Sequence, residues 1–152
     1  MAIVDDYVLQ PMIGDPDDHR PHTRWAALTD PAGIVETLAA IVEEIAPGDR
    51  IPLHVHPIDE LVLYRSGQVT VILGSDRRRV REGGVAFIPA GVAHSTENHG
   101  TEPASVFAVY PSTRVGIEYR ERNPAPGTED HDPREPVIYD FRTGSVVPSA
   151  GR

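Results

Sequence analysis

The sequence predicts an all-β barrel or sandwich, and three observations lead to this prediction. From Arg50 onward, short runs rich in β-branched and aromatic residues are separated by Gly, Asn, Asp and Pro, the residues that turns require. The turns recur about every eight to twelve residues, which is the spacing of strands in a sandwich or barrel. The 152 residues include 13 Gly and 15 Pro, which favour short strands and loops over a helical bundle.

The first 48 residues contain three candidate strands and one break. Residues 3–9 are expected to form a short strand, and the charged, proline-containing stretch 14–22 then interrupts regular structure. Residues 24–30 form the second candidate strand. The stretch 34–48 suits a helix by its Leu, Ala and Glu content and a strand by its β-branched residues, and its position beside a chain of hairpins favours a strand.

The central and C-terminal parts of the chain differ in composition. Seven short β-rich runs follow Arg50, and the chain becomes rich in Pro and charge after Arg120. Residues 136–141 are expected to add a last strand, and the rest of the tail to be loosely held. We find no internal repeat, so we expect one domain over residues 1–152, with a barrel core at about 24–119 and extensions at 3–9 and 120–152.

Composition and charge limit the partners and the location. The formal net charge of −9 makes nucleic acid and anionic membranes unexpected partners, and no apolar run reaches the ~20 residues needed to cross a bilayer. The absence of cysteine excludes disulfides, thiolate ligands and cysteine nucleophiles. The acidic N-terminus does not have the pattern of a signal peptide, so a cytoplasmic location is expected. A local basic cluster is interpreted as a solvated hairpin edge; it consists of Arg65, Arg77, Arg78, Arg79 and Arg81.

The stretch HVHPIDE, residues 54–60, is the first candidate for a functional site. Residues two apart on a strand share a face about 6.5 Å apart, so His54 and His56 project to the same side. Glu60 joins them if the strand resumes beyond Pro57. Burying three such groups without a partner is costly, and a divalent cation removes that cost. His94, which follows a Pro–Gly turn, is available as a fourth ligand.

Two motifs resemble those of the cupin family. The first cupin motif is Gly, five residues, His, one residue, His, three or four residues, Glu, six residues, Gly, and this chain matches it at Gly48, His54, His56, Glu60 and Gly67. The second is Gly, five residues, Pro, one residue, Gly, two residues, His, three residues, Asn, and the chain matches it at Gly83, Pro89, Gly91, His94 and Asn98. The motifs cover residues 48–98, about a third of the chain.

The resemblance implies a double-stranded β-helix, or jelly-roll barrel, with a metal site inside it. His54, His56, Glu60 and His94 are expected to bind one divalent transition metal per chain. Three imidazoles and one carboxylate suit Fe, Mn, Ni, Co or Zn better than Mg or Ca, which prefer oxygen ligands. Four protein ligands on a six-coordinate ion leave about two positions open for substrate, water or O2. The family also implies a homodimer.

The reaction stays open because cupin barrels host dioxygenases, decarboxylases, isomerases, lyases and non-catalytic binding proteins. We expect a metal-dependent enzyme acting on a small organic substrate, with dioxygenase chemistry ahead of lyase, decarboxylase or isomerase chemistry; a non-catalytic binding protein is the alternative from another class. Tyr64 shares the parity of the ligands and is a candidate acid or hydrogen-bond donor, or a packed core tyrosine. Tyr119 is the second catalytic candidate. Further residues that could take part are Trp25, Tyr110, Arg114 and His99, of which His99 is expected to point outward.

A narrower likeness supports the lyase alternative. Residues 44–56 and 109–119 are similar to small single-barrel cupin lyases that cleave dimethylsulfoniopropionate. In those enzymes a tyrosine two residues after the glutamate ligand is implicated as the base. Val62 occupies that position here, whereas Tyr119 lies near the place of a second tyrosine.

Overall fold

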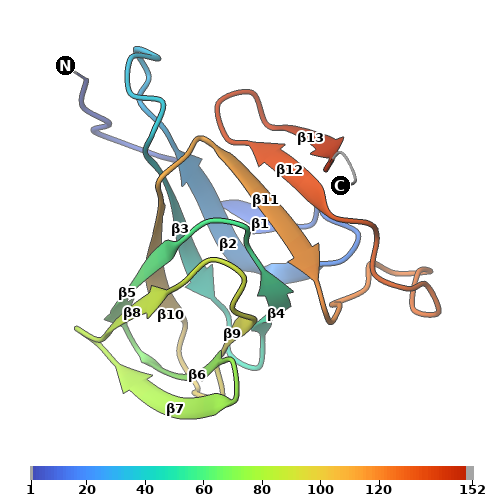
Figure 1. The fold of residues 1–152 in the computed structure, drawn as a ribbon. Coiled ribbons are helices and arrows are strands. Elements are labelled where there is room, and N and C mark those ends of the chain that lie inside the picture. Colours follow the sequence, from blue (N-terminus) through green and yellow to red (C-terminus); the bar gives the residue numbers. More distant parts are fainter. Residues whose placement is uncertain (1, 150–152) are drawn as a thin grey trace.

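The chain folds into two antiparallel β-sheets that face each other (Figure 1). The computed structural model describes residues 2–149, and within this range there are thirteen strands and no helix. A helix long and apolar enough to cross a membrane is therefore not found among residues 2–149. Between residues 39 and 119 each successive strand lies in the other sheet, except within the hairpin of residues 68–81, and this is the connectivity of a jelly roll.

The first sheet has six strands in the order β1-β2-β3-β10-β5-β8. Its strands pair antiparallel throughout, and alternate residues of β5 and β10 are buried, so one face lies against the barrel interior. The strands are β1 (Gln10–Met12), β2 (Arg20–Leu28), β3 (Ala39–Ile45), β5 (Glu60–Ser66), β8 (Val85–Ile88) and β10 (Ala104–Tyr110).

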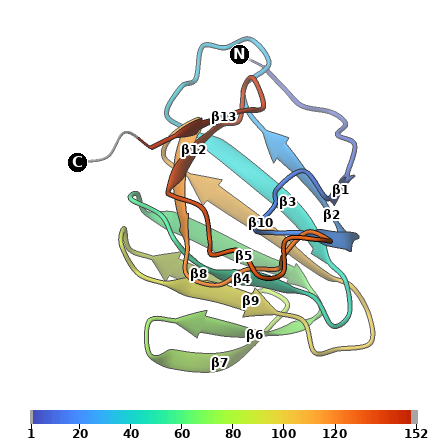
Figure 2. The same ribbon diagram turned by 90° about the vertical axis from the view of Figure 1, so that its right-hand side faces the viewer.

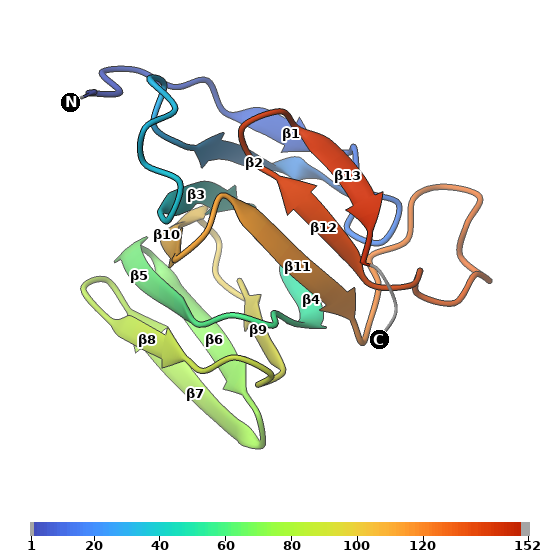
Figure 3. The ribbon, with the colours of Figure 1, turned by 45° about the horizontal axis from the view of Figure 1, so that its top comes forward.

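The second sheet has seven strands in the order β13-β12-β11-β4-β9-β6-β7. Figure 3 shows them in this order, from β7 at the lower end to β13 at the upper end. The strands are β4 (Arg50–Val55), β6 (Gln68–Leu73), β7 (Asp76–Arg81), β9 (His94–Glu97), β11 (Arg114–Tyr119), β12 (Val137–Asp140) and β13 (Ser145–Pro148).

The hydrophobic core lies between the inner faces of the two sheets. It is built largely from small and β-branched side chains, together with two tyrosines; its buried members are Ile45, Val62, Tyr64, Val69, Val71, Ile88, Ala104, Val106, Ala108, Tyr110 and Val115. Because many of these side chains are short, the sheets do not meet everywhere. The gap between them becomes the cavity described below.

The structure confirms most of the predicted strands and corrects two segments. The stretches 34–48 and 136–141 contain β3 and β12, and the predicted strand 24–30 overlaps β2. This strand begins earlier than predicted, at Arg20, inside the stretch 14–22 that the sequence marks as a break. Residues 3–9 are not a strand: the first one begins at Gln10, and the apolar side chains of Ile3 and Val8 remain exposed, so no burial favours pairing.

The C-terminal tail is more ordered than expected. Residues of β13 pair with β12 in a hairpin, which the views of Figures 1 and 2 place beside β11 at one end of the second sheet. The last residues of the expected tail, 150–152, lie outside the described residues.

Candidate metal centre

The four expected ligands come from three strands and one connecting loop that meet at one end of the barrel interior. His54 lies in β4 and is directly paired with His94, the first residue of β9. His56 follows β4, and Glu60 begins β5. The loop between them is held by a hydrogen bond from the Gly91 amide to the His56 carbonyl, 2.8 Å long.

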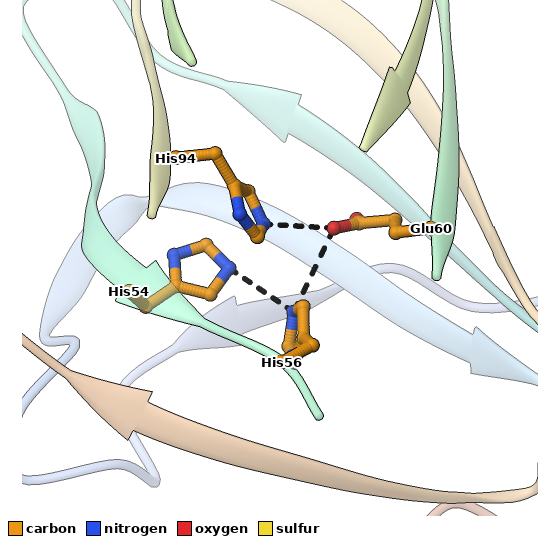
Figure 4. Close-up of side chains that lie close together, drawn as sticks. All are labelled: His54, His56, Glu60 and His94. Atoms are coloured by element: carbon orange, nitrogen blue, oxygen red, sulfur yellow. Dashed lines mark hydrogen bonds and ion pairs between the residues drawn. The ribbon is translucent and has the colours of Figure 1, made fainter. Parts of the chain in front are cut away.

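The ligand atoms converge, as the sequence predicts (Figure 4). One ring nitrogen or carboxylate oxygen from each residue lies within 4.8 Å of all the others. The Nε2 atoms of His54 and His56 are 3.1 Å apart, and Glu60 Oε2 lies 2.8 Å from His94 Nε2. All four side chains are buried. The predicted cluster is thus a real spatial group within the barrel.

Backbone carbonyls fix the tautomer of each imidazole. The Nδ1 atoms of the three histidines lie 2.6 to 2.8 Å from the carbonyl oxygens of Pro52, Gly116 and Val92. A carbonyl oxygen only accepts, so each Nδ1 carries the proton and each neutral ring presents its Nε2 lone pair to the centre. This is the arrangement that neighbouring groups impose on metal-binding histidines.

The centre of the cluster therefore lacks a hydrogen-bond donor. Glu60 Oε2 and His94 Nε2 are buried without a hydrogen-bond partner. Although 2.8 Å is ion-pair distance, the proton of a neutral His94 is committed to the Val92 carbonyl, so the two atoms face each other as acceptors. Such a group of lone pairs is costly in an apolar interior. A divalent transition ion fits it, because nitrogen and carboxylate ligands are what these ions prefer.

The electrostatics of the site favour the forms that bind metal. Burial, with the neighbouring His94 and His56, lowers the pKa of His54 well below its usual value. Burial also lowers the pKa of His56. Burial raises the pKa of Glu60, whereas the hydrogen bond from Tyr110 and any charge on the His94 and His56 rings lower it, and the pKa lies below its usual value. Neutral imidazoles and an ionised carboxylate are the forms that coordinate metal ions.

Tyr110 is a site residue whose role the sequence does not reveal. Its hydroxyl donates a 2.9 Å hydrogen bond to Glu60 Oε1, and its side chain is buried at the end of β10. This bond occupies one carboxylate oxygen and leaves the other, Oε2, directed at the histidines. The sequence does indicate that Tyr110 points inward, because alternate residues of β10 share a face and Tyr110 lies on the face of Val106 and Ala108.

The two tyrosines expected to be catalytic both line the cavity. The hydroxyl of Tyr64 lies 3.3 Å from Thr96 Oγ1, and burial raises the pKa of Tyr64 to about 12. The hydroxyl of Tyr119 donates to Asp15 Oδ2 over 3.0 Å. Burial and the carboxylates of Asp18 and Asp15 raise the pKa of Tyr119 well above its usual value. A catalytic role for either tyrosine stays a prediction.

The other residues considered from the sequence have different positions. Asn98 is buried and caps a turn, since it accepts a hydrogen bond from the Gly100 amide and donates to the carbonyls of Ile45 and Glu102. His99 is exposed, as expected, and contacts Glu97. Arg114 is exposed at the start of β11. Trp25 lines the cavity.

A cavity of about 410 Å3 adjoins the ligand cluster. Its floor is aliphatic, with side chains such as Val62, Val71, Ile88 and Val106, and aromatic side chains stand around it; these are Trp25, Tyr64, Tyr110, Tyr119, Tyr139 and Phe141. A space of this size accommodates a small organic molecule with one end at the metal site.

The fold and the site together define a jelly-roll barrel with a buried cluster of side chains that could hold a metal ion. Residues 41–110 match the family described as the cupin domain, so the chain contains a cupin domain. It is 28% identical over 120 residues to the tetracenomycin polyketide synthase protein TcmJ of Streptomyces glaucescens, covering 76% of this chain and 80% of that protein. It is 30% identical over 126 residues to the germin-like protein 1-2 of Oryza sativa subsp. japonica, covering 76% of this chain and 56% of that protein. The chain thus spans little more than half of the germin-like protein.

Among solved structures, a sugar phosphate isomerase of the cupin superfamily from Silicibacter pomeroyi superposes with a TM-score of 0.59. The two chains are 21% identical, and the match covers 85% of this chain and 78% of that one. At this identity the likeness demonstrates a common fold and carries no information about the reaction.

Proposed function

We propose that the protein is a metal-dependent enzyme that acts on a small organic substrate inside the barrel, with chemistry of the dioxygenase type. One observation carries this proposal. Three Nε2 atoms and one carboxylate oxygen form a buried cluster without a hydrogen-bond donor, and the cluster lies beside a largely apolar cavity. An apolar pocket with a few convergent polar groups is typical of sites that bind small molecules in enzymes.

The residues of this chain would divide the work among them. His54, His56, Glu60 and His94 would hold the ion, and a transition ion such as iron supplies a redox-active centre with open positions for a chelating substrate and O2. The aliphatic part of the wall would limit the access of water, which strengthens polar interactions beside it. Tyr64 keeps its proton at neutral pH because its pKa is raised to about 12, so it acts as a hydrogen-bond donor to a substrate oxygen and not as a base.

Two further facts support this reading. The Streptomyces relative is named as a tetracenomycin polyketide synthase protein, a name that agrees with an organic substrate. The tyrosine that would act as the base of a lyase is replaced by Val62, an aliphatic wall residue of the cavity. The valine at this position favours a bound, chelating substrate over proton removal by a tyrosine there.

A lyase, decarboxylase or isomerase is the second candidate, and one contact favours it. Tyr119 donates to Asp15, a buried carboxylate whose pKa burial raises above its usual value. A buried pair of this kind at the cavity wall can transfer protons to and from a substrate.

Metal analysis followed by oxygen-electrode assays tests the proposal. The protein is purified without added metal, its metal content is measured, and O2 uptake is followed with enol, catechol and thiol substrates. The proposal expects iron or another redox-active ion, and O2 uptake that is absent in a His94→Ala variant. Product formation without O2 uptake would favour a lyase, decarboxylase or isomerase instead. A ligand retained through purification that still binds a Glu60→Gln variant, without turnover, would indicate a binding protein.

A further inference from the structure

A buried ion cluster forms part of the cavity wall at a place separate from the metal ligands. Arg20, at the start of β2, is almost fully buried and forms paired hydrogen bonds with Asp18 at 2.6 and 2.7 Å. It also contacts Glu43 of β3, through Nη1 at 3.0 Å and Nη2 at 3.4 Å. Asp18 and Glu43 line the cavity, whereas Arg20 lies behind them.

The charges in this cluster do not balance. Two carboxylates share one guanidinium, and the other charged group that acts on Glu43 is Glu60, which is also an acid. Burial raises the pKa of Glu43 above its usual value despite the opposing effect of Arg20. An uncompensated negative charge in a low-dielectric wall is costly unless a cation comes to it.

Glu43 also has unused hydrogen-bonding capacity. The residue is only 6% exposed, and its Oε1 atom has a single long contact, 3.4 Å from Arg20. An ionised carboxylate accepts about four hydrogen bonds. The remaining lone pairs of Glu43 are on a side chain that borders the cavity, where a bound molecule can reach them.

The neighbour of Glu43 on the cavity wall is an aromatic ring. Trp25 of β2 is the direct partner of Glu43 in the β2–β3 pairing, so the two side chains lie on the same face of the sheet. Both line the cavity. The faces of tryptophan rings attract cations, and combinations of aromatic and acidic side chains are used to recognise organic ammonium groups.

Basic side chains are missing from this wall. The chain contains no lysine, and among residues 2–149 no arginine lines the cavity. A phosphate or carboxylate at this end of a substrate would therefore meet Asp18 and Glu43, whose shared cation, Arg20, is already hydrogen-bonded to both of them. Like-charge contacts of this kind cost affinity.

We propose that the substrate is an organic cation, with a protonated amine bound between Glu43 and Trp25 while its other end faces the metal ligands. This inference deepens the proposed function and rests on it for the end at the metal. It disfavours doubly charged phosphate esters, because the charged side chains that line the cavity away from the ligands are all acidic.

Fluorescence of Trp25 tests the proposal directly, because it is the only tryptophan in the chain. Chelator-treated protein is titrated with three probes of similar size: 2-phenylethylamine, the neutral 2-phenylethanol and the anionic 3-phenylpropionate. The amine should bind at least about tenfold tighter than the alcohol, the difference expected for a desolvated cation beside an aromatic ring and a carboxylate. The anion should bind most weakly. Equal binding of amine and alcohol, or tighter binding of the anion, would overturn the inference.

Two neighbouring variants locate the effect. Glu43→Gln should remove the preference for the amine, whereas Glu44→Gln, at an exposed position on the opposite face of β3, should retain it. Circular dichroism verifies that each variant is folded. A preference that persists in folded Glu43→Gln would refute the role of this residue. If that variant does not fold, the probe series on the unaltered protein still decides.

The test separates this inference from the proposed function. The probes are applied without metal, so amine selectivity can hold in a protein that has no oxygenase activity. Conversely, O2 uptake with a neutral substrate and no amine selectivity would retain the proposed function and refute the cationic substrate.

Discussion

The orientation of each metal-ligand imidazole depends on one backbone carbonyl. The carbonyls of Pro52 and Val92 accept from His54 and His94, each two residues further along the chain. The carbonyl of Gly116, in β11, accepts from His56. Cβ atoms are tolerated poorly at Gly116, where one would lie 2.8 Å from the Pro57 ring. The site is therefore preorganised by main-chain groups, which a side-chain substitution elsewhere does not remove.

Tyr110 should set the metal affinity through Glu60. Tyr110→Phe removes the 2.9 Å hydrogen bond to Oε1 and frees the carboxylate to rotate. We expect metal affinity to fall by about tenfold or more, as is typical when a partner of a ligand is removed. Competition titration with a chromogenic chelator measures it.

Tyr64→Phe is the matched control for that experiment. It removes a buried hydroxyl from the same cavity, but this hydroxyl contacts Thr96 and not a ligand. Metal affinity should stay within about twofold of the unaltered protein, because no ligand loses a partner. An equal loss in both variants would mean that Tyr110 acts through packing alone.

The raised pKa of Glu43 predicts a pH dependence of stability. Because the folded state holds this proton more tightly than the unfolded state, the contribution of Glu43 to stability is full below its usual pKa of 4.5 and is lost as pH rises through the folded pKa. Relative to the unaltered protein, Glu43→Gln should therefore gain stability as pH rises above 4.5, with a slope of at most about 1.4 kcal/mol per pH unit. Urea unfolding at a series of pH values checks this, and a difference that is independent of pH would contradict it.

At the scale of residues, the sequence predicts what depends on spacing and misses what depends on distant partners. The four ligands follow from two motifs with fixed intervals. Tyr110 and Glu60 are 50 positions apart, and Arg20 and Glu43 are 23 apart. Their contacts arise from the pairing of β2 with β3 and of β10 with β5, which no single interval in the chain encodes.

Among the elements, the hairpin turn at Gly67 is constrained both by its backbone conformation and by close packing. Its φ is +81°, and a Cβ there would lie 3.0 Å from both Cα and Cβ of Ala104. Gly83 has a similar φ of +84° with no atom within 4 Å of the added Cβ. A substitution at Gly83 therefore tests backbone strain alone, whereas one at Gly67 tests strain together with close packing.

Alanine substitution should reveal that difference. Gly83→Ala should destabilise the protein by about 1 kcal/mol through the strained φ alone. Gly67→Ala should cost about 1 kcal/mol more, because Ala104 must move. Chemical denaturation compares the two variants, and equal losses would show that the turn can relax without a penalty.

The elements that sequence predicts well are those with a clear period and clear turns. Strands β4 to β10 fall in the run of β-rich segments after Arg50. The segment 3–9 has apolar residues but nothing to pack them against, so it is not a strand, whereas β13 forms because β12 offers it an edge. The β-propensity of a segment does not show whether a neighbouring strand is available, so it cannot distinguish segment 3–9 from β13.

For the whole molecule, exposed apolar residues on the first sheet suggest how copies associate. Phe87 is 73% exposed and Val85 47% exposed on β8, an edge strand of that sheet, and Leu38 nearby is 55% exposed. We propose that this surface pairs with a second copy of the chain, since an apolar edge strand otherwise promotes aggregation. Light scattering should give about twice the chain mass of 16.6 kDa.

A charge on this surface should separate the copies. Phe87→Glu should shift the measured mass to that of one chain, whereas Val147→Glu, on β13 of the other sheet, should leave it unchanged. A mass near 16.6 kDa for the unaltered protein would contradict the dimer.

The central claim is that the four converging side chains bind one metal ion, and elemental analysis tests it most directly. The protein is exposed to a mixture of Fe, Mn, Co, Ni and Zn salts, dialysed and analysed by inductively coupled plasma mass spectrometry, alongside the double variant His54→Ala/His94→Ala and the exposed-histidine control His99→Ala. We predict about one transition ion per chain in the unaltered protein and the control, and close to none in the double variant. Metal-free unaltered protein, or equal metal in the double variant, would contradict the claim.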